Sequence, residues 1–291
     1  MWALVIDLTR ERGVARFGRV TLTELTPNEE RQIRELLQAL EVVPEWLTLT
    51  SGLQPRLVPG SDLAYDDGRA HPYQVSYAAW AAMLAAVSHL ACLRDSLFRW
   101  TGPDRVDAKI HTHGPFSLVR GALENASRVV WMLEPNDSDE RLLRRLQLEW
   151  KESSAQDAVR QLMGSPVKSK DDRLQELVDL LPPATTDPDE IKLKKKEIKA
   201  NPGYATIVET AGKYLRSGSS PPKLVWQACS ALAHGDYRGT LGYSDREVLA
   251  EQSPGIILAL ITANVMLLTR GTQLAIETMR VAWRLYNRRA S

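Results

Sequence analysis

Residues 73–100 read YQVSYAAWAAMLAAVSHLACLRDSLFRW, a stretch that contains neither glycine nor proline. Alanine and leucine are strong helix formers, whereas glycine and proline interrupt helices. The stretch therefore predicts one helix that is roughly 42 Å long, at about 1.5 Å per residue. A helix of this length needs neighbours of comparable length to cover its apolar surface, which predicts a helical bundle.

Further helical segments lie on both sides of this stretch, and most of them end at a proline or a glycine. The last one contains the most apolar run of the chain, residues 256–268. This run is shorter than the roughly 20 residues of a membrane span and therefore predicts a buried helix. The predicted helices are 27–43, 73–100, 115–133, 138–163, 204–215, 222–234 and 254–288. The predicted fold is an all-α bundle of six to eight helices.

The sequence also predicts the domain organisation. Residues 1–65 are interpreted as a small N-terminal appendage and linker, with a short strand at 20–25 and a helix that Thr26 caps. Glycines, prolines and aspartates between residues 51 and 72 predict a long loop. Residues 66–291 are interpreted as the bundle domain, interrupted by an exposed, weakly packed insertion at 166–202.

The insertion is rich in lysine. Five lysines lie close together in it: Lys192, Lys194, Lys195, Lys196 and Lys199. Such a cluster is typical of a nucleic-acid contact. It is also typical of a solvated helix, because glutamates are interleaved with the lysines and no aromatic side chain is present for base stacking. The second interpretation is favoured.

Composition narrows the function classes. The formal net charge is +1, so a nucleic acid or an anionic membrane would have to meet a local patch of charge. The N-terminus lacks the basic start and the apolar run of a signal peptide, which favours a cytoplasmic location without a membrane partner. Cys92 and Cys229 lie in apolar helical stretches and are interpreted as small core residues.

Polar side chains interrupt the predicted helix at 224–234. The segment is apolar around its circumference, which predicts a buried helix. Its exceptions are Gln227, Ser230 and His234, which share one face. A buried polar group without a partner destabilises a fold by about 1–3 kcal/mol, so a neighbouring helix should present a complementary polar stripe.

The helix at 115–133 carries such a stripe. Arg120, Glu124 and Arg128 are four residues apart and alternate in charge, whereas Asn125 lies within the apolar arc and needs its own partner. One interpretation is a solvent-facing ladder of ion pairs, worth roughly 0.2–0.5 kcal/mol per pair. The other is a polar network that joins this stripe to His234 across the bundle.

Motifs for a metal or a cofactor are weak. His111 and His113 form a His-Thr-His sequence, but further ligands at the usual spacing are not evident nearby. The sequence contains no glycine-rich phosphate loop and no nucleophile elbow. No metal and no cofactor are therefore expected.

Two segments resemble a known family. LVRGALENA at 118–126 is similar to an Arg-x3-Glu helix, and SALAHG at 230–235 is similar to a Ser-x3-His-Gly segment, both found in uncharacterised helical bacterial proteins that resemble the HEPN superfamily. The resemblance covers mainly residues 72–165 and 204–287. It implies a HEPN-like bundle core and a homodimer that recognises or cleaves RNA in a stress, toxin or defence setting.

The resemblance also implies roles for individual residues. His234 would act as general acid or base with Arg120 and Glu124 beside it, and Arg128, Ser230, Gln227 and Asn125 would contact RNA or a nucleotide phosphate. Family members usually carry an arginine shortly before the histidine. Here the corresponding positions hold Gln227, Ala228 and Cys229, so the arginine must come from the other helix. The alternative is a non-enzymatic interaction or dimerisation module, in which the same residues set the helix register.

Overall fold

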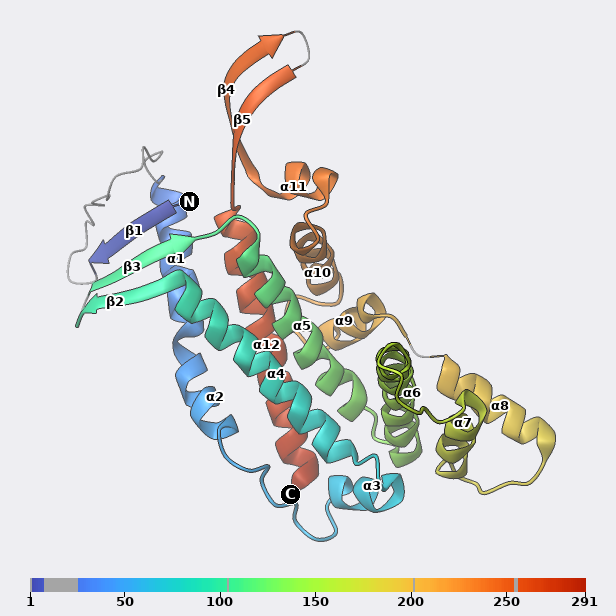
Figure 1. Ribbon diagram of the computed structural model, residues 1–291. Coiled ribbons are helices and arrows are strands. Elements are labelled where there is room, and N and C mark those ends of the chain that lie inside the picture. The colour runs from blue at the N-terminus through green and yellow to red at the C-terminus, as the bar shows by residue number, and fades with distance from the viewer. Residues whose placement is uncertain (1, 8–25, 104, 201, 254–255) are drawn as a thin grey trace.

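The computed structural model describes residues 2–7, 26–103, 105–200, 202–253 and 256–291. Most of these residues lie in helices, so the predicted all-α bundle is confirmed (Figure 1). The strand predicted at 20–25 lies outside the described residues. Two small antiparallel sheets accompany the helices.

Three long helices form the centre of the bundle: α4 (Val75–Leu97), α5 (Gly114–Leu133) and α12 (Val265–Ala290). They run side by side in Figure 1, and α5 packs against both of the others. Close approach depends on Gly271, because a Cβ atom there would lie only 2.9 Å from Val119 Cγ1 on α5. The apolar faces of these three helices supply most of the residues of the hydrophobic core.

The N-terminal helices α1 (Pro27–Ala39), η1 (Leu40–Val42) and α2 (Val43–Thr50) pack on this centre. Thr26 caps α1 as predicted. Its hydroxyl accepts from the backbone N–H of Glu29 at 3.3 Å, and the Glu29 carboxylate accepts from the backbone N–H of Thr26 at 2.7 Å. Leu36 and Leu40 are fully buried in the same core as the bundle helices.

A short helix, α3 (Asp62–Ala70), occupies part of the segment that composition predicts to be a loop. It is held to α6 (Ser138–Leu162) by a buried ion pair. Arg141 donates through Nε and Nη2 to the two Asp66 carboxylate oxygens at 2.6 and 2.9 Å. Asp66 is 0% exposed and Arg141 is 2% exposed. The helix therefore forms because tertiary contacts outweigh its local glycine and aspartates.

The lysine-rich insertion contains α7 (Lys170–Asp179) and α8 (Pro188–Lys199), and both pack against α6. Leu177 and Ile198 are fully buried there, so the segment is better packed than its composition predicts. Lys194 corrects the interpretation of a wholly solvated cluster. It is buried, and its ammonium donates to the backbone oxygens of Leu181 at 2.7 Å and of Pro183.

The long helix α4 ends at Leu97, and the chain continues as strand β2 (Phe98–Gly102) rather than as helix to residue 100. β3 (Arg105–Ile110) lies between β2 and β1 (Trp2–Asp7) in an antiparallel sheet. Among the described helices, α4 is long and apolar enough to cross a membrane, and half of its most apolar window is buried inside the protein. It is a core helix of this bundle.

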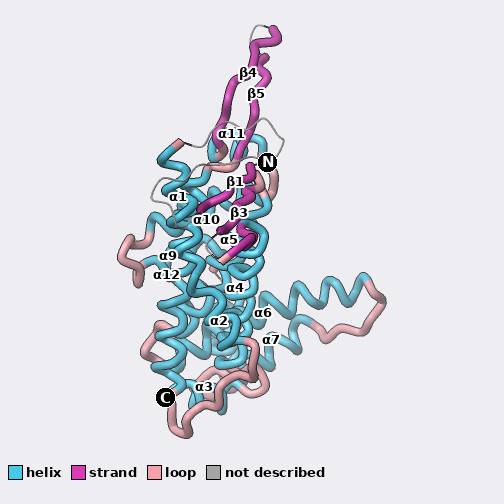
Figure 2. The backbone as a smooth tube through the Cα atoms, turned by 90° about the vertical axis from the view of Figure 1, so that its left-hand side faces the viewer, coloured by secondary structure: helices cyan, strands magenta, loops and turns pink. Residues whose placement is uncertain are grey.

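Residues 204–262 form α9 (Tyr204–Gly212), α10 (Ser220–Ala233), α11 (Tyr237–Tyr243) and the hairpin β4 (Asp245–Ser253) with β5 (Ile256–Thr262). The hairpin extends beyond the helices (Figures 1 and 2). The predicted helix over 254–288 is therefore wrong in its first third. Ile256 and Ile257 are 57% and 53% exposed on a strand rather than buried in a helix. Their β-branched side chains favour the extended backbone.

The two cysteines lie in different environments. Cys229 on α10 is buried, as predicted, and burial raises the pKa of its thiol to about 12. Cys92 on α4 is exposed, which corrects its interpretation as a core residue. Its neighbour Leu93 occupies the buried face of α4 instead.

Candidate functional site

The C-terminal end of α10 meets the N-terminal half of α5. Gly235, with a φ of +64°, ends α10, and His234 occupies the C-cap position just before it. The imidazole of His234 lies against Arg120 on α5, with Arg120 Nη1 3.0 Å from His234 Nε2. A guanidinium can only donate, so Nε2 is the accepting nitrogen of the ring in this arrangement.

Two further side chains orient the Arg120 guanidinium. Its Nε donates to Glu124 Oε1 at 2.8 Å, one helical turn along α5. The same carboxylate oxygen accepts from Trp226 Nε1 on α10, also at 2.8 Å. Arg120 in turn lies over the Trp226 ring, 5.7 Å from its centroid, in a cation–π contact. The carboxylate therefore links the two helices and holds the guanidinium beside the histidine.

A second histidine joins the same two helices. His113 precedes α5, and its Nδ1 lies 3.0 Å from the carbonyl oxygen of Leu232 near the end of α10. A carbonyl oxygen can only accept, so Nδ1 carries the proton of this ring. The Leu232 carbonyl also accepts from the backbone N–H of Gly235 at 3.2 Å, so His113 is an additional donor at the C-terminal end of α10. His113 therefore positions the end of α10 that carries His234.

The site is open to solvent at one end and covered at the other. His234 is exposed, whereas the side chains of Arg120 and Glu124 are 24% and 15% exposed. The two polar stripes that the sequence identifies therefore meet at Arg120, Glu124 and His234. We name these three residues together with Trp226 the Arg120–His234 cluster.

Other residues predicted for the site lie elsewhere. Arg128 pairs with Glu152 on α6, and the side-chain amide of Asn125 donates to the Gly121 carbonyl at 2.9 Å on its own helix. Gln227 is exposed and Ser230 is half-buried, and neither side chain forms a hydrogen bond with any residue that the structure describes. Only the N-terminal part of the α5 stripe, Arg120 and Glu124, thus contributes to the cluster.

The helix that carries His234 is less buried than its composition predicts. Leu224 is 64% exposed, because α10 lies at the side of the bundle and packs on α5, α9 and α12. Trp226 and His113 belong to the site although the sequence did not predict a role for them there. Trp226 directly precedes the polar position Gln227, and an indole N–H seeks an acceptor when it is partly buried. The need of this N–H for an acceptor was therefore the sequence feature that could have identified Trp226 as a site residue.

The chemistry of the cluster follows from its donors. Arg120 uses Nε and one N–H of Nη1, which leaves three of its five N–H groups for an anionic ligand. His234 can accept a proton at Nε2 once a ligand replaces Arg120 as the partner of that nitrogen. Among the described residues, no group of three or more His, Cys, Asp or Glu side chains is placed to hold a metal ion.

The fold and the cluster together define a class, a helical-bundle protein with an arginine–histidine pair at a helix junction. No protein-family model, no curated protein and no solved structure matches the chain. The function is therefore inferred from the geometry of the cluster.

Proposed function

We propose that the protein binds RNA at the Arg120–His234 cluster and cleaves it without a metal ion. The single observation that supports this function is the contact of 3.0 Å between Arg120 Nη1 and His234 Nε2, at a site where the histidine is exposed. It places a permanent cation beside an imidazole, the side chain that most often acts as a general acid or base. In the cleavage of a phosphodiester, the cation stabilises the charge on the phosphate and the imidazole accepts the proton of the attacking hydroxyl.

In the proposed reaction His234 Nε2 accepts the proton of a ribose 2′-hydroxyl. The 2′-oxygen then attacks the adjacent phosphorus, and the bond from phosphorus to the 5′-oxygen breaks. The leaving 5′-oxygen takes a proton from solvent, and a 2′,3′-cyclic phosphate remains on the other product. Arg120, released from Nε2, donates to the phosphate oxygens and stabilises the charge that develops on them.

Glu124 and Trp226 act on this reaction through Arg120. The carboxylate fixes the guanidinium at Nε, and the indole ring supports its face. Both are positioning residues, because neither is placed at the reacting atoms. The resemblance to the HEPN superfamily agrees with this proposal in substrate and in the role of the histidine, and it extends the proposal to a homodimer.

The test is cleavage of a mixed pool of single-stranded RNA by the full chain in the presence of EDTA. Replacing a general base removes typically a factor of 10² to 10⁴ in rate, so His234→Ala and Arg120→Ala should each lower cleavage by at least about 100-fold. His71→Ala is the matched control, because His71 is exposed on a different part of the fold and its Nδ1 lies 3.3 Å from the side-chain amide nitrogen of Gln74. It should retain the wild-type rate.

Equal background cleavage by the wild type and by His234→Ala would contradict the proposal. That outcome would favour the alternative function, a non-enzymatic interaction module in which the cluster sets the register between α5 and α10. Product analysis is a second check, since the mechanism requires cyclic phosphate ends.

A further inference from the structure

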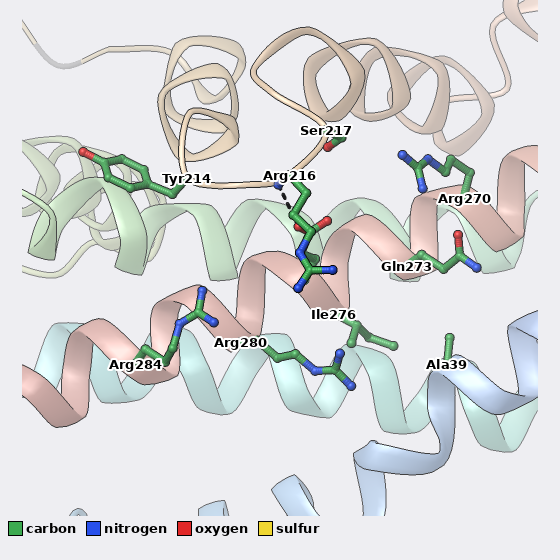
Figure 3. A pocket seen from close by; sticks show the side chains of 10 residues that line it. Ala39, Tyr214, Arg216, Ser217, Arg270, Gln273, Ile276, Arg280 and Arg284 are labelled. Atoms are coloured by element: carbon green, nitrogen blue, oxygen red, sulfur yellow. Dashed lines mark hydrogen bonds between the residues drawn. The ribbon is translucent and has the colours of Figure 1, made fainter.

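A pocket of about 630 Å³ lies beside α12, and none of its lining residues belongs to the Arg120–His234 cluster. Its walls come from three parts of the chain: α12, the end of α1 and the loop that joins α9 to α10. Four arginines line it, Arg270, Arg280 and Arg284 from α12 and Arg216 from the loop (Figure 3). We name it the arginine pocket.

The arginines of α12 are arranged on one face of the helix. At about 100° per residue, positions 270, 273, 277, 280 and 284 fall within an arc of about 80°. The opposite face carries the buried residues Leu268, Ala275 and Met279, which pack in the bundle core. Helix packing therefore forces these polar side chains to the same side, where the α9–α10 loop adds a fourth guanidinium.

The positive charge of the pocket is not neutralised. Four arginines face one carboxylate, that of Glu277. None of the four guanidinium groups forms an ion pair with any residue that the structure describes. Glu277 Oε1 accepts from the backbone N–H of Arg216 at 2.9 Å and so holds the loop against α12. Arg280 and Arg284 are one turn apart, a spacing at which like charges destabilise a helix. A bound anion would remove that repulsion.

The close view shows how the side chains of the pocket lie. The side chain of Arg216 descends from the loop toward α12 and ends above Arg280, with Arg284 to its left and Ser217 higher up (Figure 3). The Ser217 hydroxyl oxygen is buried without a hydrogen-bond partner among the described residues. Tyr214 adds no negative charge, because partial burial and its hydrogen bond to Glu134 raise its pKa to about 12.

Size favours a small ligand over a polymer. Pockets for small molecules typically enclose about 300–1,000 Å³, and this pocket lies within that range. Arginine pairs with phosphate oxygens through two parallel N–H donors, and four arginines exceed what one phosphate group can use. We propose that the arginine pocket binds the phosphate chain of a small ligand that carries two or more phosphate groups, either a nucleotide or an inorganic polyphosphate.

The test is isothermal titration calorimetry on the full chain with four probes: inorganic tripolyphosphate, ATP, AMP and orthophosphate. Tripolyphosphate and ATP should bind saturably and at least about tenfold more tightly than AMP and orthophosphate. Tighter binding of ATP than of tripolyphosphate would identify a nucleotide, and the reverse would identify an inorganic polyphosphate. Equal affinity for all four probes would contradict the need for several phosphates.

Two variants test whether the pocket is the site. Arg280→Ala with Arg284→Ala should weaken tripolyphosphate binding by at least about 100-fold, since each charge-assisted contact is worth about a factor of ten or more. The matched control is Arg160→Ala with Arg246→Ala, which removes the same charge from exposed positions on α6 and β4. Glu277→Gln keeps an acceptor for the Arg216 N–H and removes the negative charge. Glu277→Gln should tighten tripolyphosphate binding about threefold. Misfolding would weaken binding instead, so a gain in affinity cannot result from misfolding.

Three further outcomes would overturn the proposal. The first is the absence of saturable binding by both tripolyphosphate and ATP. The second is binding that the Arg280/Arg284 double variant leaves unchanged. The third comes from an added arm with single-stranded oligouridine: if this RNA binds through Arg280 and Arg284 while tripolyphosphate does not, the pocket is part of an RNA path.

Discussion

Glu124 is the residue on which the geometry of the candidate site depends. Its carboxylate accepts from Arg120 and from Trp226, and its own side chain is only 15% exposed. Glu124→Ala would leave a partly buried indole N–H and a guanidinium without this partner. We expect the free energy of unfolding to fall by about 1–3 kcal/mol, measured by urea denaturation with circular dichroism.

Glu152→Ala is the control for this substitution. It removes the partner of Arg128, but the Glu152 side chain is 48% exposed. Exposed ion pairs contribute about 0–1 kcal/mol. If both variants lose the same stability, Glu124 does not have the linking role that the structure assigns to it.

The cysteines provide a second test at the residue scale. The thiolate is the reactive form of cysteine, and burial raises the pKa of Cys229 to about 12. Cys229 should therefore stay protonated and unreactive through pH 9, and become reactive only as the pH approaches 12 or as the protein unfolds. A maleimide reagent at pH 7.5 should label only Cys92, which mass spectrometry of peptides can read. Rapid labelling of Cys229 in the folded protein would mean that α10 opens readily.

At the scale of elements, the apolar run at 256–268 could form either one buried helix or a strand followed by a helix, and two substitutions distinguish these folds. Leu258 lies on β5 and is 47% exposed, whereas Leu268 lies on α12 and is 0% exposed. Leu268→Ala should lower the free energy of unfolding by about 2–5 kcal/mol, because it leaves a cavity. Leu258→Ala should change it by no more than about 0.5 kcal/mol.

Chemical denaturation of the two variants measures both values. A single buried helix over the whole run, as local hydrophobicity predicts, would make both substitutions strongly destabilising. The structure contradicts that prediction because β4 supplies backbone partners for residues 256–262. Nothing within the run itself indicates that partner.

The ion pair between α3 and α6 gives the second test at this scale. Asp66→Ala would leave Arg141 buried without its carboxylate, and breaking a buried pair in this way destabilises by about 3–5 kcal/mol. Asp139→Ala is the control, since Asp139 pairs with Arg69 but is 57% exposed. Thermal unfolding should show a clear loss for the first variant and almost none for the second. Similar losses would mean that the pair does not join the two helices.

The sequence predicts several elements well and others poorly, for a physical reason. The α5 and α6 bounds follow from a proline, a glycine and an N-terminal cap, which act within one or two turns. The α3 helix depends on Arg141, which lies 75 residues beyond Asp66 in the chain, and strand β5 depends on β4, which directly precedes the apolar run. Candidate site residues divide in the same way. A network between the α5 stripe and His234 was one of the two interpretations of the facing stripes, whereas the pairing of Arg128 with Glu152 requires the position of α6.

At the scale of the whole molecule, both halves of the cluster belong to one chain. Arg120 and His234 are 114 residues apart and meet within the same bundle. If RNA cleavage depends on this pair, mixing Arg120→Ala with His234→Ala protein should not restore activity, because every chain in the mixture lacks one partner. The measurement is the RNA cleavage rate of the mixture, with each variant alone as reference.

Recovery of activity on mixing would contradict this prediction. It would show that the working pair forms between two copies of the chain, as in a dimer that completes its site across the interface. Light scattering on the same samples would then determine the oligomeric state.

Local patterns by themselves determined the helical class, the long central helices and the two polar stripes, because periodicity, caps and helix breakers act between near neighbours in the chain. Tertiary structure alone decided the Asp66–Arg141 pair and the arginine pocket. Both join segments that are distant in sequence, such as the α9–α10 loop and α12. The contacts that create them are formed only when the helices pack, so no local pattern carries them.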